Sequence, residues 1–505
     1  MKNVNSQKAI GAFIKKLREK RLLTQGELAN RLDTTQSTIA RIEAGRQNLT
    51  ASELLRIGDA LEHKIVSLSN STDFRIYGGR KLGGSITTNS SKNGAMGLLC
   101  ASLLNKGTTM LHGIPRIEEV NRMIEILSLL GVKLRWTDKQ TLEITPPKKI
   151  NKQGLLHSSV GSVRSSIMFI PSMVHSLHNF ALLHTGGCKM GERTISAHRY
   201  AFSEFGVEIE TKNNKYVVFS KKLHPANIVM YEASDTATEN AIMMAALIPG
   251  ITEISFATPN YQVQEVCFFL DKLGVKIEGI GTTTLKIHGV REINKNIEYY
   301  NSEDPIESMM FISAAVTTSS KLTVKRCPID FLSLELIKLK AMGLKYKISK
   351  KYIAKNGYTK LVDITIYPSK LNAVKDKIHA LPYPGLNSDN LPFFVPIATQ
   401  AVGTTLIHDW MWENRAIYFT ELNRLGANIT LADPHRVFVN GPTKLKSAQM
   451  VCPPALRPAM IILIAMLASP GVSILRNVYS INRGYEDVVE RLNSIGAHIE
   501  KITGV

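Results

Sequence analysis

The sequence predicts an α/β protein with two lobes built from six copies of one α/β unit, preceded by a small all-α helix-turn-helix domain. A motif of apolar–Gly–apolar–x–apolar follows a helical stretch six times, and its glycines lie 75, 68, 69, 83 and 70 residues apart. The first seventy residues lack this motif and place apolar residues at helical spacing instead. A chain of 505 residues also exceeds what one core normally organises.

Composition indicates a globular protein whose partners carry negative charge. Apolar residues make up 44% of the chain, and the formal net charge is +20. Residues 1–72 hold 12 basic and 7 acidic side chains, so most of the excess lies in the larger part. DNA binding alone therefore does not account for the charge, which favours phosphorylated small molecules as further partners.

Cysteine spacing and hydropathy predict a cytoplasmic protein without a membrane span. The five cysteines are far apart and form no CxxC pair, which is typical of reduced thiols and predicts no metal site. The N-terminal residues lack the apolar core of a signal peptide. The longest uncharged stretch, between Arg457 and Arg476, is interrupted by Pro470-Gly471, which favours a buried helix, a turn and a strand.

The N-terminal domain, predicted over residues 1–68, has a helical pattern from Ala9 to about Leu68. Thr24 caps a second helix, with Glu27 completing a capping box. A third helix runs from about Thr35 to Ala44 and ends at Gly45. At least one more helix follows, and the small polar residues 69–74 are interpreted as a linker.

The third helix of this domain has a polar leading face suited to the major groove of DNA. That face is formed by Thr35, Gln36, Ser37, Thr38 and Arg41. The stretch LTQGELANRLDTTQSTIARIEAG resembles the lambda-repressor/Cro-type helix-turn-helix family. The resemblance implies that Gln25 holds a phosphate, and that residues at the start of the third helix read bases. The alternative is a helical bundle used only for dimerisation or protein contact.

The six repeats account for the rest of the chain. Their glycines are Gly131, Gly206, Gly274, Gly343, Gly426 and Gly496. Each suits a helix C-terminus where φ turns positive, and the alternating residues that follow predict a strand. Earlier in the copies lie apolar helices without a polar face, which predicts helices buried inside surrounding sheets. They are 95–104, 165–173, 241–247, 308–316 and 458–468.

Three copies per lobe predict one lobe over residues 92–302 and another over 75–91 plus 303–505, with a ligand cleft between them. Two segments point to the chemistry of that cleft. Lys92-Asn93 follows the segment FRIYGGRKLGGSITTNSS, and the glycine-rich loop 186–193 carries Cys188 among cations. A thiol beside Lys189 and Arg193 should have a lowered pKa.

Residues 73–505 resemble the enolpyruvyl transferases, in particular the UDP-N-acetylglucosamine 1-carboxyvinyltransferases. The resemblance implies an inside-out α/β barrel type of fold and transfer of an enolpyruvyl group from phosphoenolpyruvate to a sugar hydroxyl. Phosphoenolpyruvate is then a co-substrate, and no cofactor is implied. The implied site residues are Lys92, Asn93, Arg164, Cys188, Arg193, Ser234, Asp304, Glu307, Asp389, Arg415, Arg457 and Arg483.

Within this set the resemblance implies distinct roles. Lys92 contacts phosphoenolpyruvate, Asn93 touches the acceptor, Cys188 donates a proton or adds covalently, and Asp389 takes the acceptor hydroxyl proton. The arginines hold carboxylate and phosphate groups, for which planar bidentate donors are suited. Addition followed by elimination needs one acid and one base, and closure of the lobes would exclude water.

The acceptor-binding stretches depart from the family pattern. The stretch Ser-Val-Gly-Ala-Thr, which approaches the diphosphate, is Ser234-Asp235-Thr236-Ala237-Thr238 here. The usual Glu-Pro-Glu is Asn260-Tyr261-Gln262. Asp235 places a negative charge where a phosphate would bind, which is unfavourable for that ligand.

Two functional hypotheses follow from the sequence. The first is an active transferase that uses UDP-N-acetylglucosamine or a related nucleotide or sugar as acceptor. The second is a transcription regulator whose transferase-like body senses a ligand, and a bifunctional protein is compatible with both. A DNA-binding domain of the Cro type usually needs two copies to span half-sites about 34 Å apart, which favours a homodimer.

Overall fold

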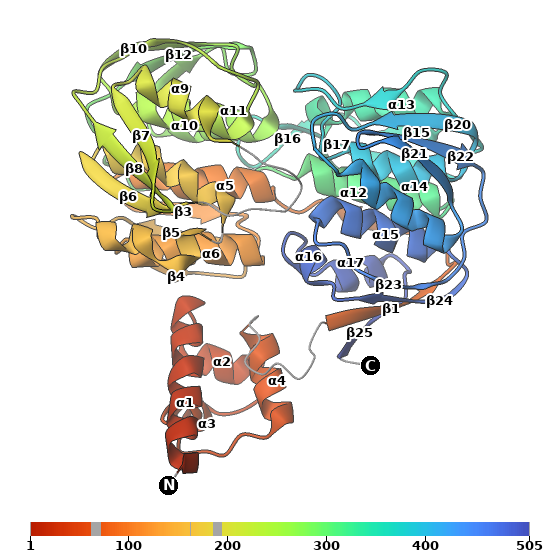
Figure 1. Cartoon of the computed structure of the whole chain (residues 1–505), viewed down its shortest axis with the longest axis horizontal. Helices are drawn as coiled ribbons and strands as arrows, with labels where there is room; N and C mark the ends of the chain where they lie inside the picture. The colour runs from red at the N-terminus through yellow and green to blue at the C-terminus, as the bar shows by residue number, and fades with distance from the viewer. Residues whose placement is uncertain (1, 62–71, 162, 185–193, 504–505) are drawn as a thin grey trace.

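The computed structural model describes residues 2–61, 72–161, 163–184 and 194–503, and it contains a small helical module beside two α/β lobes (Figure 1). The module consists of α1 (Lys2–Lys20), α2 (Gln25–Arg31), α3 (Gln36–Glu43) and α4 (Ala51–Ala60). Its first helix begins at Lys2, earlier than the apolar pattern predicts. The capping box of Thr24 and Glu27 is confirmed, because both of its hydrogen bonds are present.

The module has a small core of its own and one buried ion pair. Ile14, Leu28 and Ile39 come from three different helices and are buried together. Arg18 Nε donates to Glu43 Oε1 at 2.5 Å, and the same arginine donates to Leu23 O. This pair joins α1 to the end of α3 and so fixes the orientation of the third helix.

Strand β1 (Thr72–Gly78) corrects the expected linker, because residues 72–74 of that linker are strand. Phe74 is buried, and Asp73 accepts a hydrogen bond from the backbone N–H of Asn477. A buried aromatic ring and the ladder bonds outweigh the polar composition that suggested a linker. The rest of that segment, 69–71, lies outside the described residues.

The described residues of the first lobe form three sheets. Their strand orders are β13-β3-β5-β4, β6-β8-β7 and β11-β12-β10-β9. The strands are β3 (Thr109–His112), β4 (Lys133–Trp136), β5 (Thr141–Thr145), β6 (Asn179–Leu183), β7 (Val207–Lys212), β8 (Lys215–Ser220), β9 (Asn227–Val229), β10 (Gly250–Ser255), β11 (Lys276–Glu278), β12 (Thr284–Gly289) and β13 (Ile297–Tyr300). The helices are α5 (Lys92–Ala101), α6 (Glu118–Leu129), α7 (Ser158–Gly161), α8 (Ile170–Val174), α9 (Ser196–Ser203), α10 (Asp235–Ala246) and α11 (Tyr261–Lys272).

The second lobe also contains three sheets. Their orders are β23-β24-β1-β25, β15-β17-β14-β2 and β18-β20-β22-β21, with β16 on β17 and β19 on β20. The strands are β2 (Ser85–Thr87), β14 (Leu322–Pro328), β15 (Lys345–Ile348), β16 (Tyr352–Ile353), β17 (Lys360–Tyr367), β18 (Leu371–Asn372), β19 (Ile378–His379), β20 (Ala401–His408), β21 (Asn428–Asp433), β22 (Arg436–Gly441), β23 (Gln449–Val451), β24 (Gly471–Arg476) and β25 (Ile499–Thr503). The helices are α12 (Pro305–Thr317), α13 (Ser333–Ala341), α14 (Phe394–Ala398), α15 (Leu456–Ala468), α16 (Tyr479–Asn482) and α17 (Val488–Ser494).

The repeat glycines behave as predicted. All six have positive φ, between 84° and 101°. Each is followed by the strand at an outer edge of its sheet, namely β4, β7, β11, β15, β21 and β25. The left-handed residue ends one element and starts the next, so the repeated sequence motif is a repeated helix-to-strand turn.

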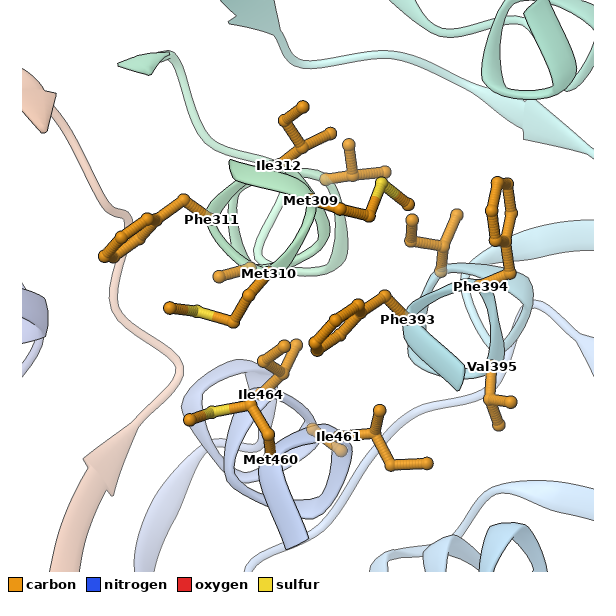
Figure 2. Packing of buried hydrophobic residues seen from close by; sticks show 14 of the residues in the cluster. Met309, Met310, Phe311, Ile312, Phe393, Phe394, Val395, Met460, Ile461 and Ile464 are labelled. Carbon is orange, nitrogen blue, oxygen red and sulfur yellow. The ribbon is translucent and has the colours of Figure 1, made fainter. Parts of the chain in front are cut away.

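The apolar helices lie inside the lobes, with the sheets outside them (Figure 1). Every residue of α12 is buried, and so is every residue of α15 except Ala468. Figure 2 shows three side chains packed against one another at the centre of the second lobe. They are Met310 of α12, Phe393 just before α14, and Ile464 of α15. Helices without a polar face have no stable place except inside such a shell.

The chain crosses between the lobes twice, and the two crossings are hydrogen-bonded to each other. Ser91 N–H donates to Ser302 O at 2.7 Å, and Asp304 N–H donates to Asn89 O at 2.8 Å. The two hydrophobic cores lie on either side of these crossings. Within the described ranges, no helix is both long and apolar enough to cross a membrane.

Candidate active site

A cavity lies between the lobes beside the two crossings. Its lining comes from both lobes and consists of Asn89, Ser90, Lys92, Pro115, Ile117, Asp304, Glu307, Gly484, Tyr485 and Glu486. Lys92 is the first residue of α5, whose N-cap Ser91 accepts a hydrogen bond from Gly94 N–H. The cavity therefore combines a helix N-terminus with a lysine, an arrangement that attracts anions.

Lys92 is held by a carboxylate that the sequence did not single out. Its Nζ bonds to Glu119 Oε2, and Arg483 Nε lies 3.5 Å from Glu119 Oε1. Burial would raise the pKa of Glu119, but Lys92 and Arg483 outweigh it and lower that pKa. Arg483 Nε is buried and makes no hydrogen bond among the described residues. Two cations thus share one carboxylate and retain capacity for a further anion.

Asp389 lies opposite, on the second lobe, between two arginines. Arg457 Nη2 donates to Asp389 Oδ2 at 3.1 Å, and Arg415 Nη1 lies 3.8 Å from Oδ1. Burial would raise the pKa of Asp389, but Arg457 and then Arg415 lower it below its ordinary value. Tyr485 bonds Arg457 through its hydroxyl at 2.7 Å. The carboxylate is therefore ionised at neutral pH and able to accept a proton.

Arg415 is fully buried, although the resemblance implies that it lines the cleft. Its guanidinium donates to Asp409 at 2.5 and 2.8 Å and to Ser388 O at 2.7 Å. Asp409 is also fully buried. The arginine therefore reaches the cleft only through Asp389, which it positions from behind. A direct contact between Arg415 and a substrate stays a prediction.

Asp304 and Glu307 lie in the first turn of α12, at the lobe crossing. Asp304 caps that helix by accepting from the N–H groups of Ile306 and Glu307. Glu307 accepts from Asn89 N–H at 2.6 Å and from Arg491 at 3.2 Å, and burial raises its pKa to about 7. Both carboxylates hold the crossing together, and both border the cavity.

The acceptor-side residues of the first lobe lie at the starts of α10 and α11. Ser234 caps α10. Asp235 follows it and accepts from Asn260 at 2.8 Å. Burial raises the pKa of Asp235 to about 6, and Asp389 adds to the shift across the cleft. Asn93 donates to the Tyr261 hydroxyl at 2.8 Å.

One turn further along α10, Glu239 is completely buried, and its Oε1 has no hydrogen-bond partner in the part of the chain described. Its Oε2 accepts from Gln262 at 3.3 Å. Burial raises the pKa of Glu239 well above its ordinary value. The two α10 carboxylates thus face two amides of α11, which are the residues that replace the family's Glu-Pro-Glu.

The glycine-rich loop with Cys188 and Arg193 lies outside the described residues, so their roles stay predictions. Arg164, at the start of a 3₁₀ turn, donates to Thr194 O at 3.3 Å beside that loop. His198 bonds Asn240, and burial lowers its pKa to about 3. It is therefore neutral and structural. The other cysteines, Cys100, Cys267, Cys327 and Cys452, are buried and free, as expected.

The predicted DNA-reading face is open to solvent. Thr35 caps α3, and the side chains of Gln36, Ser37 and Arg41 are exposed, whereas Thr38 is partly covered. Gln25 donates to the buried Glu43 at 2.9 Å. That bond fixes the amide at the N-terminus of α2, where the resemblance places a phosphate contact.

Sequence reasoning missed Glu119, Asp409 and Tyr485. Asp409 holds Arg415, and Tyr485 holds Arg457 and also lines the cavity, but nothing in their local sequence pattern distinguishes them. Glu119 had one available signal: two consecutive acids open α6, and neighbouring residues lie about 100° apart around a helix, so they meet different partners. Glu119 is the one that pairs with Lys92 at the cleft.

The fold and the cleft define an enolpyruvyl transferase joined to a helix-turn-helix module. The profile of the EPSP synthase (3-phosphoshikimate 1-carboxyvinyltransferase) family matches residues 76–492, so the chain belongs to this family of transferases. A helix-turn-helix domain profile matches residues 9–63.

Curated relatives narrow the likeness further. The chain is 34% identical to UDP-N-acetylglucosamine 1-carboxyvinyltransferase of Treponema denticola, a match that covers 85% of this chain and 99% of the relative. Identity to the protein of the same name from Borreliella burgdorferi is 32%, over 85% and 98% of the two chains.

Solved structures support the fold. The enolpyruvyl transferase NikO from Streptomyces tendae superposes with a TM-score of 0.74 at 23% identity, covering 86% of this chain and all of that one. EPSP synthase from Acinetobacter baumannii gives 0.66 at 17% identity, with coverage of 86% and 100%. The predicted two-lobed α/β fold with an N-terminal all-α domain is confirmed.

Proposed function

We propose that the protein transfers the enolpyruvyl group of phosphoenolpyruvate to a hydroxyl of UDP-N-acetylglucosamine or a related nucleotide or sugar. The observation that carries this proposal is the placement of Lys92 of the first lobe opposite Arg483 and Asp389 of the second lobe, across one cleft. Phosphoenolpyruvate has a carboxylate and a phosphate, which suit the two cations and the N-terminus of α5.

The reaction is addition followed by elimination. Asp389 takes the proton of the acceptor hydroxyl while the hydroxyl oxygen of the acceptor bonds to C2 of phosphoenolpyruvate. At the same time an acid delivers a proton to C3. Loss of a C3 proton and of inorganic phosphate then restores the double bond in the product. We assign the acid to Cys188, by resemblance. Arg457 and Arg415 hold Asp389 ionised, so it is ready to accept the first proton.

The test is release of inorganic phosphate from phosphoenolpyruvate in the presence of a panel of UDP-sugars, nucleotides and sugars. Release should require a particular acceptor, and the variant with Cys188→Ala and Asp389→Ala should show none. Turnover with none of the acceptors would remove the proposal.

Asp235 should discriminate against acceptors that place phosphate at the start of α10. Its pKa of about 6 leaves it charged at pH 8 and largely protonated at pH 5. Binding of UDP-N-acetylglucosamine to the unmodified protein should therefore tighten as pH falls from 8 to 5. Asp235→Asn should tighten binding at pH 8 about tenfold, because removing one nearby like charge contributes roughly 1.4 kcal/mol, and it should flatten the pH dependence.

Calorimetry at several pH values measures both effects. Glu253→Gln is the matched control, since it removes an acidic side chain of the same lobe at β10, and it should change neither. Weaker binding by Asp235→Asn would show that the carboxylate contacts the acceptor favourably.

The exposed reading face favours a second activity, and we propose that the module binds duplex DNA. Arg41→Ala and Gln36→Ala should each weaken binding to a selected operator about 5- to 100-fold, the cost of one base or phosphate contact. The measurement is fluorescence anisotropy at fixed salt. Glu53→Gln on α4, away from this face, should leave the affinity within twofold. Unchanged binding by all three variants would favour the protein-contact alternative.

A further inference from the structure

The helix-turn-helix module is seated on the transferase through the end of α1. Lys20 Nζ bonds to Glu125 of α6, and Arg21 Nη2 donates to Glu118 of the same helix at 3.0 Å. Leu22 packs against the core of the first lobe. Figure 1 shows the module below α6, with α1 directed toward that helix. The seat is therefore a short contact surface on one helix.

The same helix carries the carboxylate that holds the cleft cations. Glu118 and Glu119 are consecutive in the first turn of α6, and their carboxylates pair with different partners. Glu118 accepts from Arg21 of the module, while Glu119 bonds Lys92 and faces Arg483. One helical turn thus joins the module to the site that is proposed to bind phosphoenolpyruvate.

This turn also contacts the second lobe. Arg122, which donates to Glu118 at 3.1 Å, donates as well to the Tyr479 hydroxyl at 2.9 Å. Arg116, just before α6, donates its N–H to Glu486 at 3.2 Å. Arg483 lies within the same second-lobe segment. The start of α6 and this second-lobe segment are therefore joined by several polar contacts.

An incoming anion competes with Glu119. The carboxylate is paired with Lys92 and Arg483, the cations that phosphoenolpyruvate needs. Once they turn to the ligand, Glu119 is a partly buried carboxylate next to another anion, which is a costly arrangement. Without its pairs to Lys92 and Arg483, Glu119 no longer holds the first turn of α6 in place, and Glu118 can move with that turn.

We propose that α6 couples the cleft to the helix-turn-helix module, so that an anion bound at Lys92 and Arg483 releases α1 from its seat. Release frees Lys20 and Arg21 from Glu125 and Glu118, so the module gains two uncompensated cations. Its affinity for DNA phosphates rises as a result. By linkage, DNA raises the affinity for phosphoenolpyruvate by the same factor. This proposal rests on the proposed function only for the identity of the anion.

Hydrogen exchange measured on the full chain tests the contact between the end of α1 and α6. Phosphoenolpyruvate should protect the start of α5 and should increase exchange of amides 17–23 about fivefold or more, the range of typical allosteric couplings. Glu119→Gln weakens the hold on both cations and should increase exchange at 17–23 without any ligand. Glu143→Gln, which removes a carboxylate paired with the exposed Arg135, is the matched control and should not.

Anisotropy with duplex DNA of random sequence tests the consequence. Phosphoenolpyruvate should tighten DNA binding by the full chain about fivefold. Arg21→Ala, already unseated, should respond less than twofold, whereas Lys16→Ala, which removes an exposed cation of the same helix, should keep the response.

The two proposals fail separately. Protection at α5 without any change at 17–23 or in DNA affinity contradicts the coupling and leaves the enzyme proposal intact. No protection by phosphoenolpyruvate contradicts the proposed substrate. If phosphoenolpyruvate gives no protection, the coupling is judged from Glu119→Gln without ligand. Unchanged exchange of amides 17–23 in that variant would overturn the coupling, and increased exchange would support it.

Discussion

Asp389→Asn should lower kcat for enolpyruvyl transfer by about 10²- to 10⁴-fold, the usual contribution of a general base. The amide keeps the shape of the carboxylate and its oxygen can still accept from Arg457, while Arg415 stays bound to Asp409, so folding and phosphoenolpyruvate binding should persist. Steady-state kinetics should therefore show a fall in kcat with KM for phosphoenolpyruvate changed less than about threefold.

Asp330→Asn is the matched control, because that exposed aspartate of the same lobe has, among the described residues, one ion pair, with Lys360 at 3.4 Å. It should leave kcat unaltered. A variant Asp389→Asn with full activity would show that another group takes the hydroxyl proton.

Arg415→Met should lower the free energy of unfolding by about 3–5 kcal/mol, because it leaves a fully buried Asp409 without its cation. Urea unfolding followed by tryptophan fluorescence reports this change, since the Arg415 guanidinium lies 5.2 Å from the ring centre of Trp412. Activity should also fall in the folded protein, because Asp389 loses one of its two positioning arginines.

The double variant Arg415→Met with Asp409→Leu is the control for this prediction. It removes both charges, and a buried ion pair replaced by apolar side chains costs much less than a broken one. It should therefore be more stable than Arg415→Met alone. A loss below about 1 kcal/mol in the single variant would show that water or a neighbour compensates Asp409.

The repeated part of the fold could be predicted because one local signal recurs. A glycine between two apolar residues after a helix requires a left-handed turn, and Gly131 and its five counterparts adopt one. The apolar helices likewise admit only a buried position. The boundary at residues 72–74 was wrong because polar composition says nothing about a distant partner strand, and β1 is paired with β24 and β25.

The candidate site was predictable where the resemblance implies that a residue contacts substrate, and unpredictable where a residue acts through another residue. Lys92, Asp389 and Arg457 come together across the cleft from positions far apart in the chain. Glu119 holds Lys92, and Asp409 holds the Arg415 that neighbours Asp389, through tertiary contacts. Such contacts leave no local pattern in sequence, so only the folded arrangement reveals them.

The pairing of β1 with β24 and β25 imposes an order on how the chain is made. Residues 1–61 can fold as soon as they leave the ribosome, because their core is self-contained. The first lobe can follow once residue 302 has emerged. Strand β1 must wait for its partners about 400 residues later. During synthesis, the helix-turn-helix module can therefore fold before the transferase lobes on every nascent chain.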